Sequence, residues 1–121
     1  MDVLIVEENP NLGGLWTRAL ERGGAQVSCV QSQSCAIEIL RERRFDVIVV
    51  DLVLHDGGAI GVSDFVNYRW PETQVIFVTN TRFFSDGSIF QLCSNACAFV
   101  QSATPPDDLA AMVEHYAERR I

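Results

Sequence analysis

The hydrophobic and polar positions of this chain follow two patterns in turn, one typical of buried strands and one of amphipathic helices. Short apolar runs, several of them rich in β-branched residues, predict strands at about 2–6, 25–30, 46–50, 74–78 and 97–101. Apolar residues spaced three and four positions apart predict helices at about 10–22, 33–43, 59–68, 85–94 and from Pro105 onward. Strands and helices that alternate in this way are typical of a parallel sheet covered on both faces.

The first predicted helix has clear signals at both ends. Asn9 is placed to cap it, Pro10 suits its first position, and the pair Gly23-Gly24 suits its end. Its apolar residues recur at helical spacing, so we expect one buried stripe made of Leu12, Leu15, Trp16, Ala19 and Leu20.

The later helices are bounded by similar signals. The pair Gly57-Gly58 predicts a loop before the third helix. Thr104 is the expected cap of the last helix, with Pro105 at its first position. Five strands and five helices in 121 residues predict a single domain, residues 1–121, with an α/β flavodoxin-like doubly wound fold. The expected order of its five parallel strands is 2-1-3-4-5.

Carboxylates follow two of the predicted strands. Glu7 and Glu8 come directly after the first strand, and Asp51 ends the run Val47-Ile48-Val49-Val50-Asp51. The strand order makes the first and third strands neighbours, and ligands of such sheets gather at the carboxyl ends of the strands. Converging carboxylates repel unless a cation joins them, and a hard ion such as Mg²⁺ prefers oxygen ligands. The pattern therefore predicts a magnesium site at which one carboxylate attacks phosphorus.

The net charge and the length of the apolar runs bear on whether the protein binds nucleic acid or a membrane. The net charge of −7 argues against binding a nucleic-acid backbone, and all nine basic residues are arginine, since the chain contains no lysine. No apolar run has membrane-spanning length, and the first strand begins almost at Met1, so we expect a cytoplasmic protein without a signal peptide.

The four cysteines show no CxxC pair and no histidines at zinc-finger spacing. We expect Cys29, in a strand, and Cys35, in a helix, to be small buried hydrophobic residues. Cys93 and Cys97 flank a turn between helix and strand, which leaves a redox pair open as an alternative.

Taken together, these segments resemble the receiver domain of two-component response regulators over essentially the whole chain. The matching segments are residues 4–10, 46–52, 56–57 and 75–79, together with Phe99 and the helix that starts at Pro105. The resemblance implies that Asp51 accepts a phosphoryl group from a histidine kinase or a phosphotransfer protein. It further implies that Glu7, Glu8, Asp51 and the backbone carbonyl of Val53 hold Mg²⁺. Thr79 would bind the phosphoryl oxygen, and Phe99 would move with it.

The chain departs from the family pattern at the site itself. Ser102 occupies the position of the family lysine, and Ala103 that of a following proline. Glu8 replaces the more usual aspartate, which changes the reach of the carboxylate. Arg82 is the only nearby cation that could substitute for the lysine.

Two functions follow from this comparison. The first is a phosphorylation-dependent switch whose output is protein–protein contact through the fourth helix, the fifth strand and the fifth helix, with a possible homodimer through that face. The alternative is an atypical pseudo-receiver that acts as a phosphorylation-independent interaction or dimerisation module. In neither case is the chain an enzyme, beyond its own phosphorylation and possible autodephosphorylation. A flavin-binding or hydrolytic enzyme is disfavoured, because the acidic loop after the first strand offers no phosphate cradle.

Overall fold

A computed structural model describes residues 1–51, 53–54, 57–79, 96–101 and 104–119. Its helices are α1 (Pro10–Arg22), α2 (Gln33–Glu42), α3 (Ala59–Arg69) and α4 (Pro106–Arg119). Its strands are β1 (Asp2–Val6), β2 (Gln26–Val30), β3 (Val47–Asp51), β4 (Val53–Leu54), β5 (Gly57–Gly58), β6 (Gln74–Thr79) and β7 (Ala96–Gln101).

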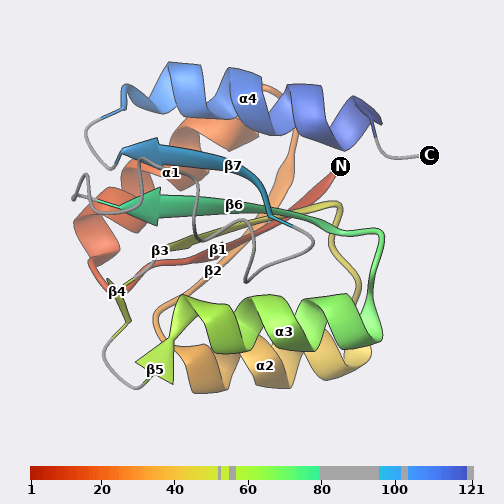
Figure 1. The fold of residues 1–121 in the computed structure, drawn as a ribbon. Coiled ribbons are helices and arrows are strands. Elements are labelled where there is room, and N and C mark those ends of the chain that lie inside the picture. The colour runs from red at the N-terminus through yellow and green to blue at the C-terminus, as the bar shows by residue number, and fades with distance from the viewer. Residues whose placement is uncertain (52, 55–56, 80–95, 102–103, 120–121) are drawn as a thin grey trace.

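Five of the strands form one parallel sheet in the order β2-β1-β3-β6-β7. Helices α1 and α4 cover one face of the sheet, and α2 and α3 cover the other (Figure 1). The predicted α/β sheet and its strand order are confirmed. Four of the five predicted helices lie among the described residues, and the helix expected at 85–94 lies outside them.

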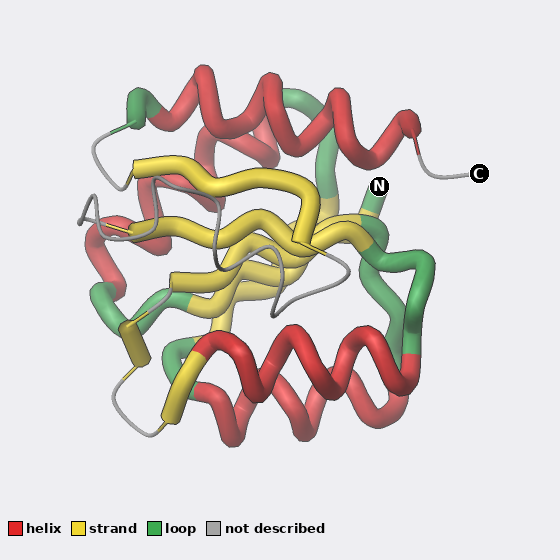
Figure 2. The backbone as a smooth tube through the Cα atoms, in the orientation of Figure 1, coloured by secondary structure: helices red, strands yellow, loops and turns green. Residues whose placement is uncertain are grey.

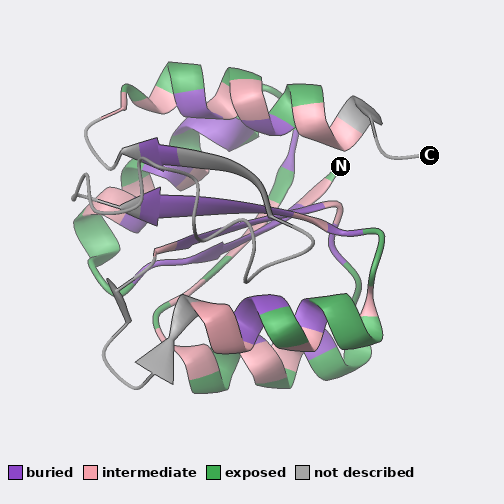
Figure 3. Ribbon diagram, viewed as in Figure 1, coloured by how far each residue is buried: buried purple, intermediate pink, exposed green. Residues whose placement is uncertain are grey.

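The sheet separates two hydrophobic cores, because alternate strand residues face opposite sides. Leu4, Ile48 and Phe77 pack on the side of α2 and α3, whereas Ile5 and Val49 pack on the side of α1 and α4. Strands β1 and β3 are buried on both faces, apart from partial exposure of Asp2 and Asp51 at their ends (Figure 3). This burial explains why their sequences read as continuous apolar runs.

Helix α1 begins and ends where its sequence predicts. The Asn9 side chain accepts hydrogen bonds from the backbone N–H groups of Asn11 and Leu12, and the helix ends before Gly23. The prediction of a fully buried apolar stripe is wrong at Leu15, which is 45% exposed. Gly13 is buried instead, because that side of the helix lies close to Cys29 of β2 and to Glu7, the residue after β1.

Two predicted boundaries are also corrected. Helix α4 begins at Pro106 rather than Pro105, and the Pro105 carbonyl accepts the first helical hydrogen bond, from the Leu109 N–H at 3.1 Å. The backbone pattern thus places Pro105, not Thr104, at the cap. The expected loop at Gly57–Gly58 is a short strand, β5, which pairs antiparallel with β4 before α3 begins (Figure 2). Glycine tolerates this extended conformation, although it does not favour it.

The prediction that Cys29 and Cys35 are buried residues is wrong. Cys29 and Cys35 are both free and exposed, because β2 is an edge strand and Cys35 lies on the outer side of α2. Cys93 lies outside the described residues. Among the described helices, none is long and apolar enough to span a membrane.

Candidate functional site

Two acidic residues lie side by side where β1 and β3 end. The register pairs Val6 of β1 with Val50 of β3, so Glu7 and Asp51 are the next residues of adjacent parallel strands. The Glu7 backbone N–H donates a hydrogen bond to the Val30 carbonyl of β2, 3.0 Å away, which fixes the backbone as it leaves the sheet. The sheet thereby brings together residues that are far apart in the sequence.

The Glu7 carboxyl group is buried, with only 2% of the residue exposed. Its Oε1 accepts a hydrogen bond from the Asn9 backbone N–H at 3.1 Å, whereas Oε2 has no donor among the residues that the structure describes. Burial, followed by a hydrogen bond with the Asp51 carboxyl, raises the pKa of Glu7 from 4.5 to about 8. The negative charges of Asp51 and Glu8 raise it further, against the lowering effect of the Asn9 N–H.

This arrangement can be stabilised in two ways. Two carboxyl groups hydrogen-bond each other only if one of them carries a proton, so in the metal-free protein a proton on Glu7 satisfies the pair. A divalent cation would replace that proton and give Glu7 Oε2 its missing partner. Carboxylate oxygens are the ligands that Mg²⁺ prefers, so the chemistry of Glu7 and Asp51 fits this ion.

The other predicted Mg²⁺ ligands, Glu8 and the Val53 carbonyl, are not gathered with Glu7 and Asp51 in the same way. Glu8 is exposed, and its charge is the weakest of the influences on Glu7. In the part of the chain that the structure describes, no group of three or more His, Cys, Asp or Glu residues is arranged to hold a metal ion. The structure therefore assembles two of the three acids, not the expected three-acid cluster. Val53, whose carbonyl was expected to contribute, begins β4 two residues after Asp51.

The predicted switch residue Thr79 lies on β6, the strand next to that of Asp51, and Phe99 lies one strand further, on β7. Asp51 pairs with Val78 in the register of β3 and β6, so Thr79 follows directly at the same edge of the sheet. Phe99 lies in β7 and pairs with Phe77. Ser102, in the position of the family lysine, lies outside the described residues, as does Arg82.

Sequence reasoning missed the residues that surround the Glu7 side chain on the α1 face. Gly13 of α1 and Cys29 of β2 both approach it, and the Glu7 charge contributes to a raised pKa of the Cys29 thiol, for which burial is the first cause. The glycine at position 13, inside an otherwise regular helix, was the sequence feature that could have pointed to this contact. A glycine within a helix often marks a place where another element packs closely against it.

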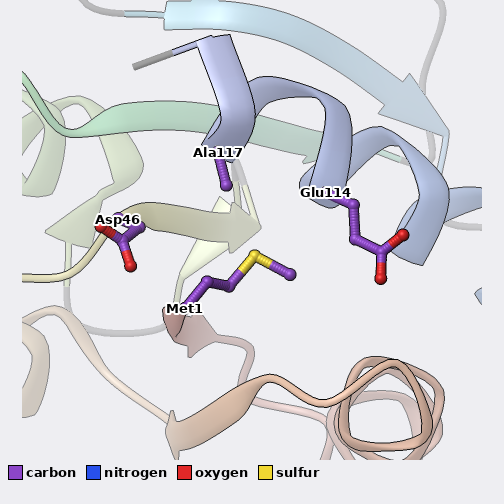
Figure 4. Close-up of a pocket in the computed structure, with 4 residues that line it drawn as sticks. All are labelled: Met1, Asp46, Glu114 and Ala117. Carbon is purple, nitrogen blue, oxygen red and sulfur yellow. The ribbon is translucent and has the colours of Figure 1, made fainter. Parts of the chain in front are cut away.

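A separate pocket of about 340 Å³ lies at the other end of the sheet, lined by Met1, Asp46, Glu114 and Ala117. Met1 and Asp46 precede β1 and β3, whereas Glu7 and Asp51 stand at their carboxyl ends. Figure 4 shows the Met1 side chain extending between Asp46 and Glu114. One oxygen of Asp46 already accepts a hydrogen bond from the Asp2 N–H at 2.8 Å, which gives this residue a structural role at the start of β1.

Comparisons with known proteins agree with this geometry. The family model of the response regulator receiver domain matches residues 3–114. A CheY-like receiver domain protein from Methanospirillum hungatei JF-1 superimposes with a TM-score of 0.89 at 19% identity, over 98% of this chain and 94% of that chain. The receiver domain of a putative Luxo repressor protein from Vibrio parahaemolyticus superimposes with a TM-score of 0.88 at 23% identity, over 98% and 91% of the two chains. No curated protein matches the sequence significantly.

Proposed function

Because the chain belongs to the response regulator receiver domain family, we propose that it is a Mg²⁺-dependent phosphoryl acceptor whose acceptor group is the Asp51 carboxylate. The observation that carries this proposal is the pairing of the buried Glu7 with the partly exposed Asp51, in which Glu7 Oε2 has no donor among the described residues. The donor would be the phosphohistidine of a histidine kinase or a phosphotransfer protein, in the cytoplasm.

The chemical step is a displacement at phosphorus. A carboxylate oxygen of Asp51 forms a bond to phosphorus while the bond between phosphorus and the histidine nitrogen breaks. The nitrogen leaves with that electron pair and regains a proton. Dephosphorylation ends the signal. Water attacks phosphorus, the bond between phosphorus and the Asp51 oxygen breaks, and inorganic phosphate leaves, so that the Asp51 carboxylate is restored.

Glu7 controls how available the Asp51 oxygen is. While Glu7 keeps its proton, it donates a hydrogen bond to Asp51 and makes that oxygen a weaker nucleophile. Once Glu7 is ionised, both carboxylates can act as ligands. Mg²⁺ held by Glu7 and Asp51, with Glu8 and the Val53 carbonyl as the further expected ligands, would neutralise charge on the transferring phosphoryl group. The hydroxyl of Thr79, which lies on the neighbouring strand, would donate a hydrogen bond to a phosphoryl oxygen.

The missing lysine affects the switch more than the chemistry in this proposal. An ammonium group that pairs with a phosphoryl oxygen strengthens the response to phosphorylation, and the hydroxyl of Ser102 carries no charge. We therefore propose that Asp51 is phosphorylated but that the phosphorylated state is weakly coupled to Thr79 and Phe99.

We propose that the domain passes its signal on by protein–protein contact through the face that includes β7 and α4. A homodimer formed through this face is one such contact. The apolar side chains that suggest this face lie outside the described residues and are Phe83, Phe84, Ile89, Phe90 and Leu92. Replacing Phe84 and Phe90 with polar residues should give a folded monomer, whereas a wild-type chain that sediments as a monomer at high concentration excludes the homodimer.

The second candidate function is a pseudo-receiver that works without phosphorylation. It is favoured by the absence of lysine and by the ability of a single proton to satisfy the Glu7–Asp51 pair without metal. Such a protein would keep the fold and its contact surfaces and lose the chemistry.

Incubation with Mg²⁺ and acetyl phosphate, followed by intact mass measurement, tests the proposal. We expect the mass of one added phosphoryl group, absent in Asp51→Asn and absent when Mg²⁺ is chelated. An unchanged mass under all conditions, with Mg²⁺ binding also undetectable, would favour the pseudo-receiver.

A further inference from the structure

The methylene groups of Glu7 and the Sγ atom of Cys29 border the same space beside Gly13, a residue that the proposed chemistry does not use. A methyl group placed on Gly13 would lie 3.0 Å from Cys29 Sγ, and 3.7 and 3.8 Å from Glu7 Cβ and Cγ. The first of these separations is tighter than atoms at such a contact ordinarily accept. Helix α1, strand β2 and the end of β1 therefore converge at Gly13, where an added side chain would require Cys29 Sγ to shift.

Hydrogen bonds hold this junction together. The Thr17 hydroxyl donates to the Gly13 carbonyl at 2.8 Å. On the strand side, the Val30 carbonyl, next to Cys29, accepts the Glu7 N–H. Although Cys29 as a whole residue is exposed, its Sγ thus lies between β2 and α1.

A buried carboxyl group beside a second one tends to turn away from it, because the two repel whenever both are ionised. Glu7 has a flexible side chain, and the backbone contacts of Glu7 hold only its N–H and Oε1. Its methylene groups border the space beside Gly13, and Cys29 Sγ borders the same space.

We propose that Cys29 is a positioning residue for Glu7: its thiol, seated in the space that Gly13 leaves open, blocks the retreat of the Glu7 methylene groups and keeps the carboxyl directed at Asp51. This inference rests on the proposed function, since the carboxyl that Cys29 positions is the one assigned to Mg²⁺. It adds a second layer to the site that neither the acidic motif nor the family pattern points to.

The test uses glycine-to-alanine variants of α1. Gly13→Ala adds a methyl group that must displace Cys29 or Glu7. Gly14→Ala is the matched control, because its added methyl group would meet only Arg18 Nη1, at 3.9 Å, while the gain in helix propensity is the same. Cys29→Ala removes the thiol, and the double variant Gly13→Ala/Cys29→Ala gives the new methyl group the space that the sulfur occupied.

Two readouts are measured on the full chain. Calorimetric Mg²⁺ titration should show a dissociation constant raised about tenfold in Gly13→Ala, the scale typical of lost support around a ligand, and unchanged in Gly14→Ala. Cys29→Ala alone should weaken binding to a smaller extent, and the double variant should recover to the level of Cys29→Ala. The NMR signal of the Asn9 amide, which donates to Glu7 Oε1, should shift in Gly13→Ala and Cys29→Ala but not in Gly14→Ala.

The two readouts separate this inference from the proposed function. If the wild type binds no Mg²⁺ but the Asn9 signal shifts as expected, the metal site fails and the positioning role stands. If Gly13→Ala and Gly14→Ala behave alike in both measurements, or if Cys29→Ala leaves the Asn9 signal and Mg²⁺ binding unchanged, Cys29 does not position Glu7.

Discussion

Glu7 and Asp51 are separated by more than forty residues in the chain, yet both lie at the carboxyl ends of two adjacent parallel strands, where burial and then a hydrogen bond between the two carboxyl groups raise the pKa of Glu7. One of the two groups must be protonated for this bond to form without a metal ion. Because Glu7 is the more buried of the pair, it is the group whose pKa is raised, to about 8.

The stability of the metal-free protein should therefore fall as the pH rises. The folded state holds a proton on Glu7 up to about pH 8, whereas the unfolded chain releases it near pH 4.5, so this contribution is complete below pH 4.5 and lost as the pH rises through 8. The slope from one proton cannot exceed about 1.4 kcal/mol per pH unit. Thermal melts in chelator between these limits measure it, and Glu7→Gln should remove most of the slope. Equal slopes in the two proteins would contradict the assignment.

Asp51→Asn should raise the melting temperature of the metal-free protein. The substitution removes one of two facing acids and supplies an amide N–H for Glu7 Oε2, a gain on the order of 1 kcal/mol. The variant should also be inert to acetyl phosphate. Chemical denaturation in chelator compares the two proteins, with Asp64→Asn, a change at an exposed position of α3, as the control. A less stable Asp51→Asn protein would show that the acid pair is not a source of strain.

Binding of Mg²⁺ should release protons at neutral pH. The ion requires ionised Glu7, so its apparent affinity should increase as the pH rises toward 8 and level off above it. Calorimetry in buffers of different ionisation enthalpy counts the protons released, and the melting temperature should increase with Mg²⁺ concentration by mass action. Binding that is independent of pH between 6 and 8 would place the ion away from Glu7.

Restoring the family lysine with Ser102→Lys should strengthen the response to phosphorylation. A charge-assisted hydrogen bond to the phosphoryl group contributes about 1.5–3 kcal/mol, and only interactions that differ between two states shift their balance. Backbone NMR spectra recorded with and without phosphodonor should change more in the variant than in the wild type, above all around Thr79 and Phe99. A wild-type spectrum that already changes fully on phosphorylation would refute the weak coupling proposed above.

Local sequence patterns are sufficient to predict the architecture of this protein. Continuous apolar runs such as Val3-Leu4-Ile5-Val6 identify strands buried on both faces, and the alternation of strands with helices leaves few ways to connect them. Local signals placed the ends of α1 correctly, because Asn9, Pro10 and Gly23 act through their own backbone and side chains. The same order of elements placed Glu7 and Asp51 next to each other.

How the site is built around those two acids depends on the packing of the elements against one another. The burial of Glu7, the exposure of Glu8 and the approach of Gly13 to Cys29 depend on how closely α1 packs against β1 and β2, a distance that no local pattern encodes. The same packing leaves Leu15 outside the core, although its spacing matches the buried stripe. Periodicity indicates which way a side chain points, whereas the pKa and role of a side chain depend on neighbours that are distant in the sequence.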